Sequence, residues 1–220
     1  MKVSEMAHGR GINEILHFTT NKGLVGILAK GELLSRRRIP EDEYLQHILM
    51  CNSAIRPENS ADFDKSKDWL DYVNLSISEV NSRFFRVSNG WHSASEIWWV
   101  ILSFDTCIMD HEGVEFATTN NGYDLCERAP GGDGFGALFV PTVGRKSPGW
   151  TASRRGRESR LPTCEQAEVL YPSSLSVRFL RKVYVEAESR ADLVRGWLRT
   201  FSIEGVEVIV SRDKFSGMPN

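Results

Sequence analysis

One carboxylate in this sequence, Glu168, lies in a pattern that suits catalysis. The segment QAEVLY at 166–171 is predicted as a β-strand, whose alternating faces direct Gln166, Glu168 and Leu170 to one side. Glu165 comes three positions earlier and is expected on the opposite face. A buried carboxylate without a partner is costly, so it is either held by hydrogen bonds or used in a reaction. Glu168 is therefore a candidate catalytic group, with a purely structural role as the alternative.

A second candidate is His17, which interrupts the apolar strand predicted at 15–19 (ILHFT). A single histidine in such a strand is more often a core residue that has found a hydrogen-bond partner than a catalyst. Nothing else in the segment decides between the two interpretations, so both stay open at the level of the residues.

The third candidate site is electrostatic. The net charge of −2 disfavours nucleic-acid binding by the surface as a whole, because phosphates must be met by a local excess of cations. Such an excess exists in residues 145–160 (RKSPGWTASRRGRESR), which carry six cations against one acid. We expect a long irregular loop there. A solvated charged loop is the alternative. The cations are Arg145, Lys146, Arg154, Arg155, Arg157 and Arg160.

Other chemistries find no support in the sequence. The histidines outside the strand (His8, His47, His92 and His111) have no metal-ligand spacing, and the sequence contains neither HExxH nor GxSxG. The four cysteines form no CxxC pair, which disfavours a zinc site or a disulfide framework. GGDGFG at 131–136 is not followed by GK[ST], so we predict a flexible turn rather than a phosphate-binding loop.

The remaining patterns indicate the elements that position these residues. A helix with Leu24, Ile27 and Leu28 on one face follows the first strand, starts at Thr20 or Asn21 and ends at Gly31. A second helix is predicted at 191–200, and a mixed segment at 44–51 suits a helix of two turns. Further strands are predicted at 71–77, 97–104, 137–143, 166–171, 182–186 and 206–211.

These elements predict an α+β fold in a single domain over residues 1–220, without repeats or linkers. No apolar run approaches the roughly 20 residues that cross a bilayer, and residues 1–10 contain no apolar stretch of signal-peptide length. We therefore expect a cytoplasmic protein.

Four segments, taken in order, resemble the DarT-type ADP-ribosyltransferases, toxins that share the diphtheria-toxin and poly-ADP-ribose polymerase fold. The first resembles the family's NAD-binding element, and the second its tyrosine-containing strand, with Val80 where the family usually has proline. The third resembles an apolar strand followed by an asparagine, here Asn120. The fourth resembles the strand with the catalytic glutamate. The segments are ILHFTTNKGLVGILAKGELLS (15–35), DYVNLSISEVNSRFF (71–85), WWVILSFDTCIM with FATTNNG (98–109 and 116–122), and LPTCEQAEVLYP (161–172).

The resemblance implies split antiparallel β-sheets with flanking helices, NAD as co-substrate and no metal. It assigns the catalytic role to Glu168, which would stabilise the positive charge that develops on the ribose and accept a proton from the attacking base. Arg56 is the candidate catalytic arginine, with Arg38 and Arg83 as alternatives. The NAD-binding residues that it implies are His17, Thr19, Asn21, Leu33 and Tyr72.

In such enzymes the loop before the catalytic strand selects the acceptor, so the resemblance implies nucleic-acid contacts for the segment around Trp150. They would involve Arg145, Lys146, Trp150, Arg154, Arg155 and Arg157. We expect a base in single-stranded DNA as acceptor, because a paired base must first be flipped out. RNA, a protein side chain, and a non-catalytic nucleic-acid-binding domain are the alternatives. The family also implies a cognate antitoxin that removes the modification or blocks the site.

Overall fold

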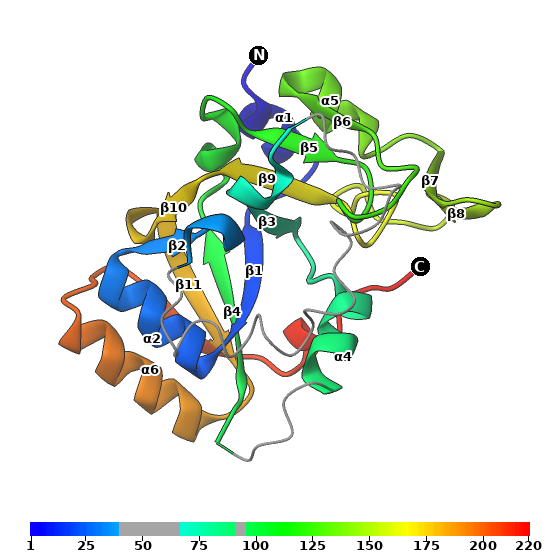
Figure 1. Cartoon of the computed structure of the whole chain (residues 1–220). Helices are drawn as coiled ribbons and strands as arrows, with labels where there is room; N and C mark the ends of the chain where they lie inside the picture. The colour runs from blue at the N-terminus through cyan, green and yellow to red at the C-terminus, as the bar shows by residue number, and fades with distance from the viewer. Residues whose placement is uncertain (40–66, 91–95) are drawn as a thin grey trace.

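The computed structural model describes residues 1–39, 67–90 and 96–220. Its centre is an eight-stranded, mostly antiparallel sheet in the order β12-β11-β4-β1-β3-β9-β5-β6 (Figure 1). The strands of this sheet are β1 (Ile15–Thr20), β3 (Tyr72–Ile77), β4 (Trp99–Phe104), β5 (Glu115–Ala117), β6 (Arg128–Pro130), β9 (Glu168–Pro172), β11 (Leu180–Val185) and β12 (Glu207–Val210). Two smaller pairs join β2 (Glu32–Leu34) to β10 (Ser174–Ser176), and β7 (Thr142–Lys146) to β8 (Trp150–Ser153).

The central sheet divides between β1 and β3. β1 pairs with β4 along all six of its residues, but with β3 only through Ile15 and Leu16. Beyond Leu16 the two strands separate, while β3 pairs with β9 along its other edge from Tyr72 to Ser76. This confirms the α+β fold with a split antiparallel sheet, and it brings His17 to the split.

Helices cover the sheet at several places. They are α1 (Val3–Gly9), α2 (Asn21–Lys30), α4 (Ser82–Gly90), α5 (Gly131–Ala137) and α6 (Glu188–Thr200). Figure 1 shows α2 and α6 side by side next to β4 and β11. The apolar faces of both helices join the main core with Val100 and Leu102 of β4. The alternate residues Trp99 and Ile101 point to the other face, which packs against Phe85 of α4. The outward and inward sides of β4 are thus both buried, as its continuous apolar run predicts.

Helix α2 has the limits that the sequence predicts for the helix after the first strand. The Thr20 side chain accepts a hydrogen bond from the backbone N–H of Gly23, so Thr20 rather than Asn21 is the N-cap. Gly31 ends the helix with φ of 73°, a left-handed conformation that suits glycine.

Three local predictions are wrong. Residues 131–137 form helix α5 rather than a turn, and the strand predicted at 137–143 starts only at Thr142. At Gly134 a Cβ atom would lie 1.9 Å from the carbonyl oxygen of Ala129, so the glycine lets α5 pack directly on β6. The segment 145–160 is no irregular loop, because β7 and β8 form a hairpin within it. The helix predicted at 44–51 lies outside the described residues.

Candidate active site

Glu168 is the first residue of β9, an interior strand between β3 and β5. Its side chain is buried, with 7% of its surface exposed. Oε2 accepts two hydrogen bonds, one from Nδ2 of Asn74 over 2.8 Å and one from the backbone N–H of Asn121 over 2.9 Å. Oε1 receives no hydrogen bond from any residue in the part of the chain that the structure describes. One carboxylate oxygen is therefore anchored, and the other is left to a ligand.

The environment of Glu168 changes its acidity. Burial raises the pKa of Glu168 to about 7, and the hydrogen bonds from Asn121 and Asn74 and the charge of Arg128 oppose this effect without cancelling it. A carboxylate whose pKa lies near neutrality can both accept and return a proton at physiological pH. The chemistry expected of Glu168 is thus compatible with its surroundings.

His17 is connected to Glu168 through one residue, Asn74, which contacts both. Its Nδ1 lies 3.1 Å from the backbone carbonyl oxygen of Asn74, the residue whose side chain binds Glu168. This contact crosses the split between β1 and β3. Burial lowers the pKa of His17, so the imidazole is neutral at pH 7 and above. A neutral imidazole that uses Nδ1 as donor keeps Nε2 as an acceptor for a ligand hydroxyl.

The other residues of the predicted NAD site differ in accessibility. Thr19 is buried two positions along β1 from His17, and Tyr72 is half-buried, with its ring 5.4 Å from that of Trp69. Asn21 is engaged with the start of β4, since its side chain donates to the Glu96 carbonyl oxygen and accepts from the Trp98 N–H. Leu33 lies in the main core. His17 and Tyr72 therefore lie on the strands that border the split, whereas Asn21 and Leu33 support the scaffold around it.

The candidates for the catalytic arginine are Arg56, Arg38 and Arg83. Arg56 lies outside the described residues. Arg38 forms a two-pronged ion pair with Asp71, which holds the pKa of that carboxylate down to about 2, and Arg83 binds the buried carboxylate of Glu165. Both alternatives thus have structural partners.

Three site residues were not found from the sequence: Asn74, Asn121 and Arg128. Asn74 stands opposite Leu170 in the β3–β9 ladder, which makes it a diagonal neighbour of Glu168 on the same face. The FATTNNG segment drew attention to Asn120, but the Asn120 side chain accepts from Gly122 within the loop, and it is Asn121 that contacts Glu168. The pairing register of the strands would have been needed to find Asn74.

The basic segment is more ordered than the sequence suggests. Arg145 is 2% exposed and hydrogen-bonds Asn220, and Arg154 donates to backbone carbonyls of residues 158, 159 and 161. Lys146 and Arg155 are exposed, and Trp150 is half-buried, 5.5 Å from the ring of Tyr123. The cations that remain accessible are therefore fewer than the six in the sequence.

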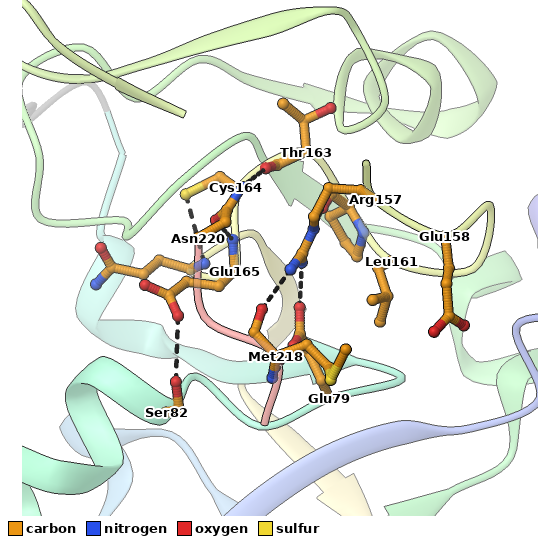
Figure 2. A network of polar contacts seen from close by, with 12 residues as sticks. Glu79, Ser82, Arg157, Glu158, Leu161, Thr163, Cys164, Glu165, Met218 and Asn220 are labelled. Atoms are coloured by element: carbon orange, nitrogen blue, oxygen red, sulfur yellow. Dashed lines mark hydrogen bonds and ion pairs between the residues drawn. The ribbon is translucent and has the colours of Figure 1, made fainter. Parts of the chain in front are cut away.

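Figure 2 shows the network that holds this segment to the end of the chain. Arg157 pairs with Glu79 and donates to the Met218 carbonyl oxygen, while the side chain of Asn220 donates to the carbonyl oxygen of Thr163 and accepts from the N–H of Glu165. Glu165 itself is buried and accepts from Ser82 and Arg83. Residues 157–165, which lead directly into β9, are thus fixed from two sides.

Neither a metal site nor a membrane span is found in the described part of the chain. No group of three or more His, Cys, Asp or Glu side chains there could hold a metal ion. None of its helices has both the length and the apolar character needed to cross a bilayer.

Comparison with solved structures relates the fold to known enzymes. The chain is similar to Thermus sp. 2.9 DarT in complex with carba-NAD+, with a TM-score of 0.62 and 15% identity over 91% of this chain and 96% of that one. The same DarT in complex with ADP-ribosylated ssDNA gives a TM-score of 0.61 and 16% identity, with 91% and 94% covered. Thermosipho africanus DarTG in complex with ADP-ribose gives 0.55 and 16%, with 92% of this chain and 50% of that one covered. No curated protein matches the chain in sequence.

These likenesses define the fold as that of an ADP-ribosyltransferase. The family model described as "ssDNA thymidine ADP-ribosyltransferase, DarT" matches residues 16–216. The chain therefore belongs to the DarT family, whose activity is the NAD-dependent ADP-ribosylation of single-stranded DNA. This confirms the family, the enzyme class and the single-stranded DNA substrate that the sequence analysis expected.

Proposed function

We propose that this chain transfers ADP-ribose from NAD to the base of thymidine in single-stranded DNA, with Glu168 as the catalytic carboxylate. The observation that carries the assignment is the arrangement of its two oxygens. Oε2 is anchored by Asn74 and Asn121, and Oε1 has no partner among the described residues. A carboxylate held in this way is oriented before the substrate arrives, which is what a reaction with a developing charge requires.

The proposed reaction balances as follows. The bond between nicotinamide and C1 of the ribose breaks, and nicotinamide leaves with the electron pair. The sugar then resembles an oxocarbenium ion, which the negative charge of Glu168 stabilises. A ring nitrogen of thymine attacks this carbon, and its proton passes to Oε1 of Glu168. The step requires an ionised Glu168 at the start, and the raised pKa makes the carboxylate a better base than an exposed one.

On the NAD side, we assign contacts with the co-substrate to His17, Thr19 and Tyr72. His17 presents one ring nitrogen beyond its contact with Asn74, and Tyr72 borders the split on β3. Asn21 and Leu33 would act through the scaffold, because their side chains are engaged with β4 and the core. Arg56 stays the candidate for the NAD diphosphate or the reacting groups. An arginine suits a diphosphate because its guanidinium binds two oxygens at once.

On the DNA side, we assign Lys146, Trp150 and Arg155 to the acceptor strand, because Lys146 and Arg155 are exposed and Trp150 is only half-buried beside them. Trp150 and Tyr123 lie close enough to receive a base on a shared aromatic surface, and Lys146 lies 4.7 Å above the Tyr123 ring. Arg145, Arg154 and Arg157, which the sequence also suggested, are used within the protein. Their contribution to DNA binding would be to hold the hairpin in place.

The experiment that tests the proposal compares the parent with Glu168→Gln, using labelled NAD and single-stranded oligonucleotides. Glu127→Gln, an exposed carboxylate in the loop between β5 and β6, is the matched control. Label should enter an oligonucleotide that contains a single thymidine, but not one without thymidine or the corresponding RNA. Glu168→Gln should abolish the label and Glu127→Gln should not. Labelled RNA or protein, or a chain that binds DNA without consuming NAD, would contradict the proposal.

The biological setting proposed here is that of a single-domain toxin in the cytoplasm, with residues 1–220 forming one ADP-ribosyltransferase domain. This setting is supported by the likeness to Thermosipho africanus DarTG, a chain of which only 50% is covered by the match. We infer a cognate antitoxin that removes the ADP-ribose or blocks the site. Co-expression of genes neighbouring that of this chain, scored by rescue of growth and by loss of label from DNA, tests this inference.

A further inference from the structure

Arg128 lies at the start of β6 and closes the loop that follows β5. Its Nε donates to Oδ1 of Asn121 over 2.6 Å, and its Nη2 donates to the backbone carbonyl oxygen of the same residue over 2.5 Å. Nη1 reaches the carbonyl oxygen of Cys126 over 3.2 Å. One planar guanidinium thus binds both the side chain and the backbone of Asn121, a geometry that a lysine ammonium cannot reproduce.

Asn121 is also one of the two donors that anchor Glu168. Its backbone N–H points at Oε2, and the direction of this N–H depends on how the residue's own peptide units are oriented. Arg128 fixes that orientation through the carbonyl group and the side chain of Asn121. A chain of contacts therefore runs from Arg128 through Asn121 to Glu168, and each link is a hydrogen bond of 2.9 Å or less.

The other side of the Arg128 guanidinium lies against Trp69, with 4.8 Å to the ring centroid. Trp69 belongs to the 3-10 helix at Trp69–Asp71, which leads into β3, and it packs with Ala117 and Leu170 on the face of the sheet that bears Glu168. Arg128 is thereby held between the loop after β5 and the element before β3. Arg128 therefore has contacts next to both neighbours of β9, with Asn121 after β5 and with Trp69 before β3.

We propose that Arg128 is a positioning residue for Glu168, acting through Asn121. The proposal rests on the proposed function, because it needs Glu168 to be the catalytic carboxylate. It predicts that Arg128 matters for the rate of transfer and for the ionisation of Glu168, but not for the affinity of either substrate.

The test measures kcat, the KM values for NAD and for a thymidine oligonucleotide, and the pH dependence of kcat, in the parent, Arg128→Met and Arg128→Lys. For Arg128→Met we expect kcat at pH 8 to fall by about 10- to 100-fold, the range for loss of a hydrogen bond to a charged group. Both KM values should stay within about twofold. The acid limb of the profile, which is the rise of kcat with pH as Glu168 ionises, should shift to higher pH. The loss of a cation and of an oriented donor raises the pKa of Glu168. Arg128→Lys should restore the limb but not the rate.

The groups around Glu168 make this profile interpretable. Asn74 of β3 and Asn121 of the loop are neutral, and burial raises the pKa of the Cys126 thiol to about 11. Burial lowers the pKa of His17. Among the described residues, Arg128 is thus the charged group whose removal changes the pKa of Glu168 in the neutral range. Arg178→Met, at an exposed arginine after β10, is the matched control and should leave the limb unchanged.

Two outcomes would overturn the proposal. One is an Arg128→Met protein with lower thermal stability but an unchanged acid limb and kcat. The other is a change confined to the KM for DNA, which would make Arg128 an acceptor contact.

If Arg128→Met does not fold, Asn121→Ala decides, since it removes the Oδ1 contact and keeps the backbone N–H. A loss of rate and a shifted limb in Asn121→Ala support the proposal, and a parental profile rejects it. An active Glu168→Gln protein would instead contradict the proposed function itself.

Discussion

Asn74 and Glu168 are joined across neighbouring strands by a hydrogen bond of 2.8 Å, in which the asparagine amide donates to Oε2. The backbone carbonyl oxygen of the same asparagine lies 3.1 Å from Nδ1 of His17, on the other side of the split. Asn74 thus connects the proposed NAD side of the site with the catalytic carboxylate. Its side chain is exposed, so the hydrogen bond to Glu168, rather than packing, holds the side chain in this orientation.

Replacement of Asn74 by alanine should lower the rate of transfer without unfolding the protein. A hydrogen bond to a charged group is worth about 1.5 to 3 kcal/mol, so kcat should fall by roughly 10- to 100-fold. The change is measured with saturating NAD and oligonucleotide at pH 8. Asn13→Ala, at an exposed asparagine before β1, should behave like the parent. An Asn74→Ala protein with parental kcat would show that the Asn121 N–H alone orients Glu168.

The pH dependence of transfer should follow the ionisation of Glu168. Because the pKa of Glu168 is raised to about 7, kcat should rise between pH 6 and pH 8, with about a tenth of the plateau at pH 6. The pKa of His17 is lowered, so His17 should add no second step above pH 6.5. The profile is measured with saturating substrates in constant ionic strength. A flat profile between pH 5.5 and pH 8 would exclude a neutral-range carboxylate from the rate-limiting step.

Glu168→Gln should be more stable than the parent at high pH. The folded-state pKa lies above the ordinary value of 4.5, so the stability that Glu168 contributes is full below pH 4.5 and is lost as pH rises through about 7. A shift from 4.5 to about 7 corresponds to roughly 3 kcal/mol. Glutamine can accept both hydrogen bonds of Oε2 and carries no charge. Urea unfolding at pH 5 and pH 8.5 should show the variant gaining on the parent, and an equal difference at both pH values would contradict this.

The strands of the site could be predicted from the sequence, and its partners could not. Four strands that are adjacent in the sheet could be identified, from the apolar runs of β1, β3 and β4 and from the pattern around Glu168. Burial on one or both faces of a strand requires apolar residues at regular positions. Asn74 was missed since its proximity to Glu168 depends on the β3–β9 register. The missed helix α5 has a similar cause: its glycines permit close contact with β6, a tertiary effect that local propensity does not contain.

The basic segment shows the same limit for electrostatics. A count of cations cannot distinguish Lys146, which is exposed, from Arg145, which is buried against Cys164, Glu165 and Asn220. The number of positive charges in 145–160 draws attention to the segment, but internal partners decide which of them can meet a phosphate.

Lys146→Ala and Arg145→Ala should differ in kind. Lys146→Ala should raise the KM for DNA and reduce the slope of log affinity against log salt by about 0.7, the value for one phosphate contact on a single strand. Its thermal stability should be parental. Arg145→Ala should instead lower the free energy of unfolding by about 3 kcal/mol or more, because it leaves buried partners without their cation. Parental stability in Arg145→Ala, with weaker DNA binding, would return Arg145 to the DNA surface.

The end of the chain should stabilise the segment that leads into β9. Asn220 accepts a hydrogen bond from Arg145. Figure 2 shows that its side chain also accepts from the N–H of Glu165 and donates to the Thr163 carbonyl oxygen. Asn220→Ala should therefore cost about 1 to 3 kcal/mol in urea unfolding, since it leaves partly buried groups unpaired. Met218→Ala is the matched change, because the Met218 side chain is half exposed and its contacts with Arg157 and Glu79 use backbone atoms. An Asn220→Ala protein as stable as the parent would mean that backbone contacts alone hold the segment and that the Asn220 side chain adds nothing.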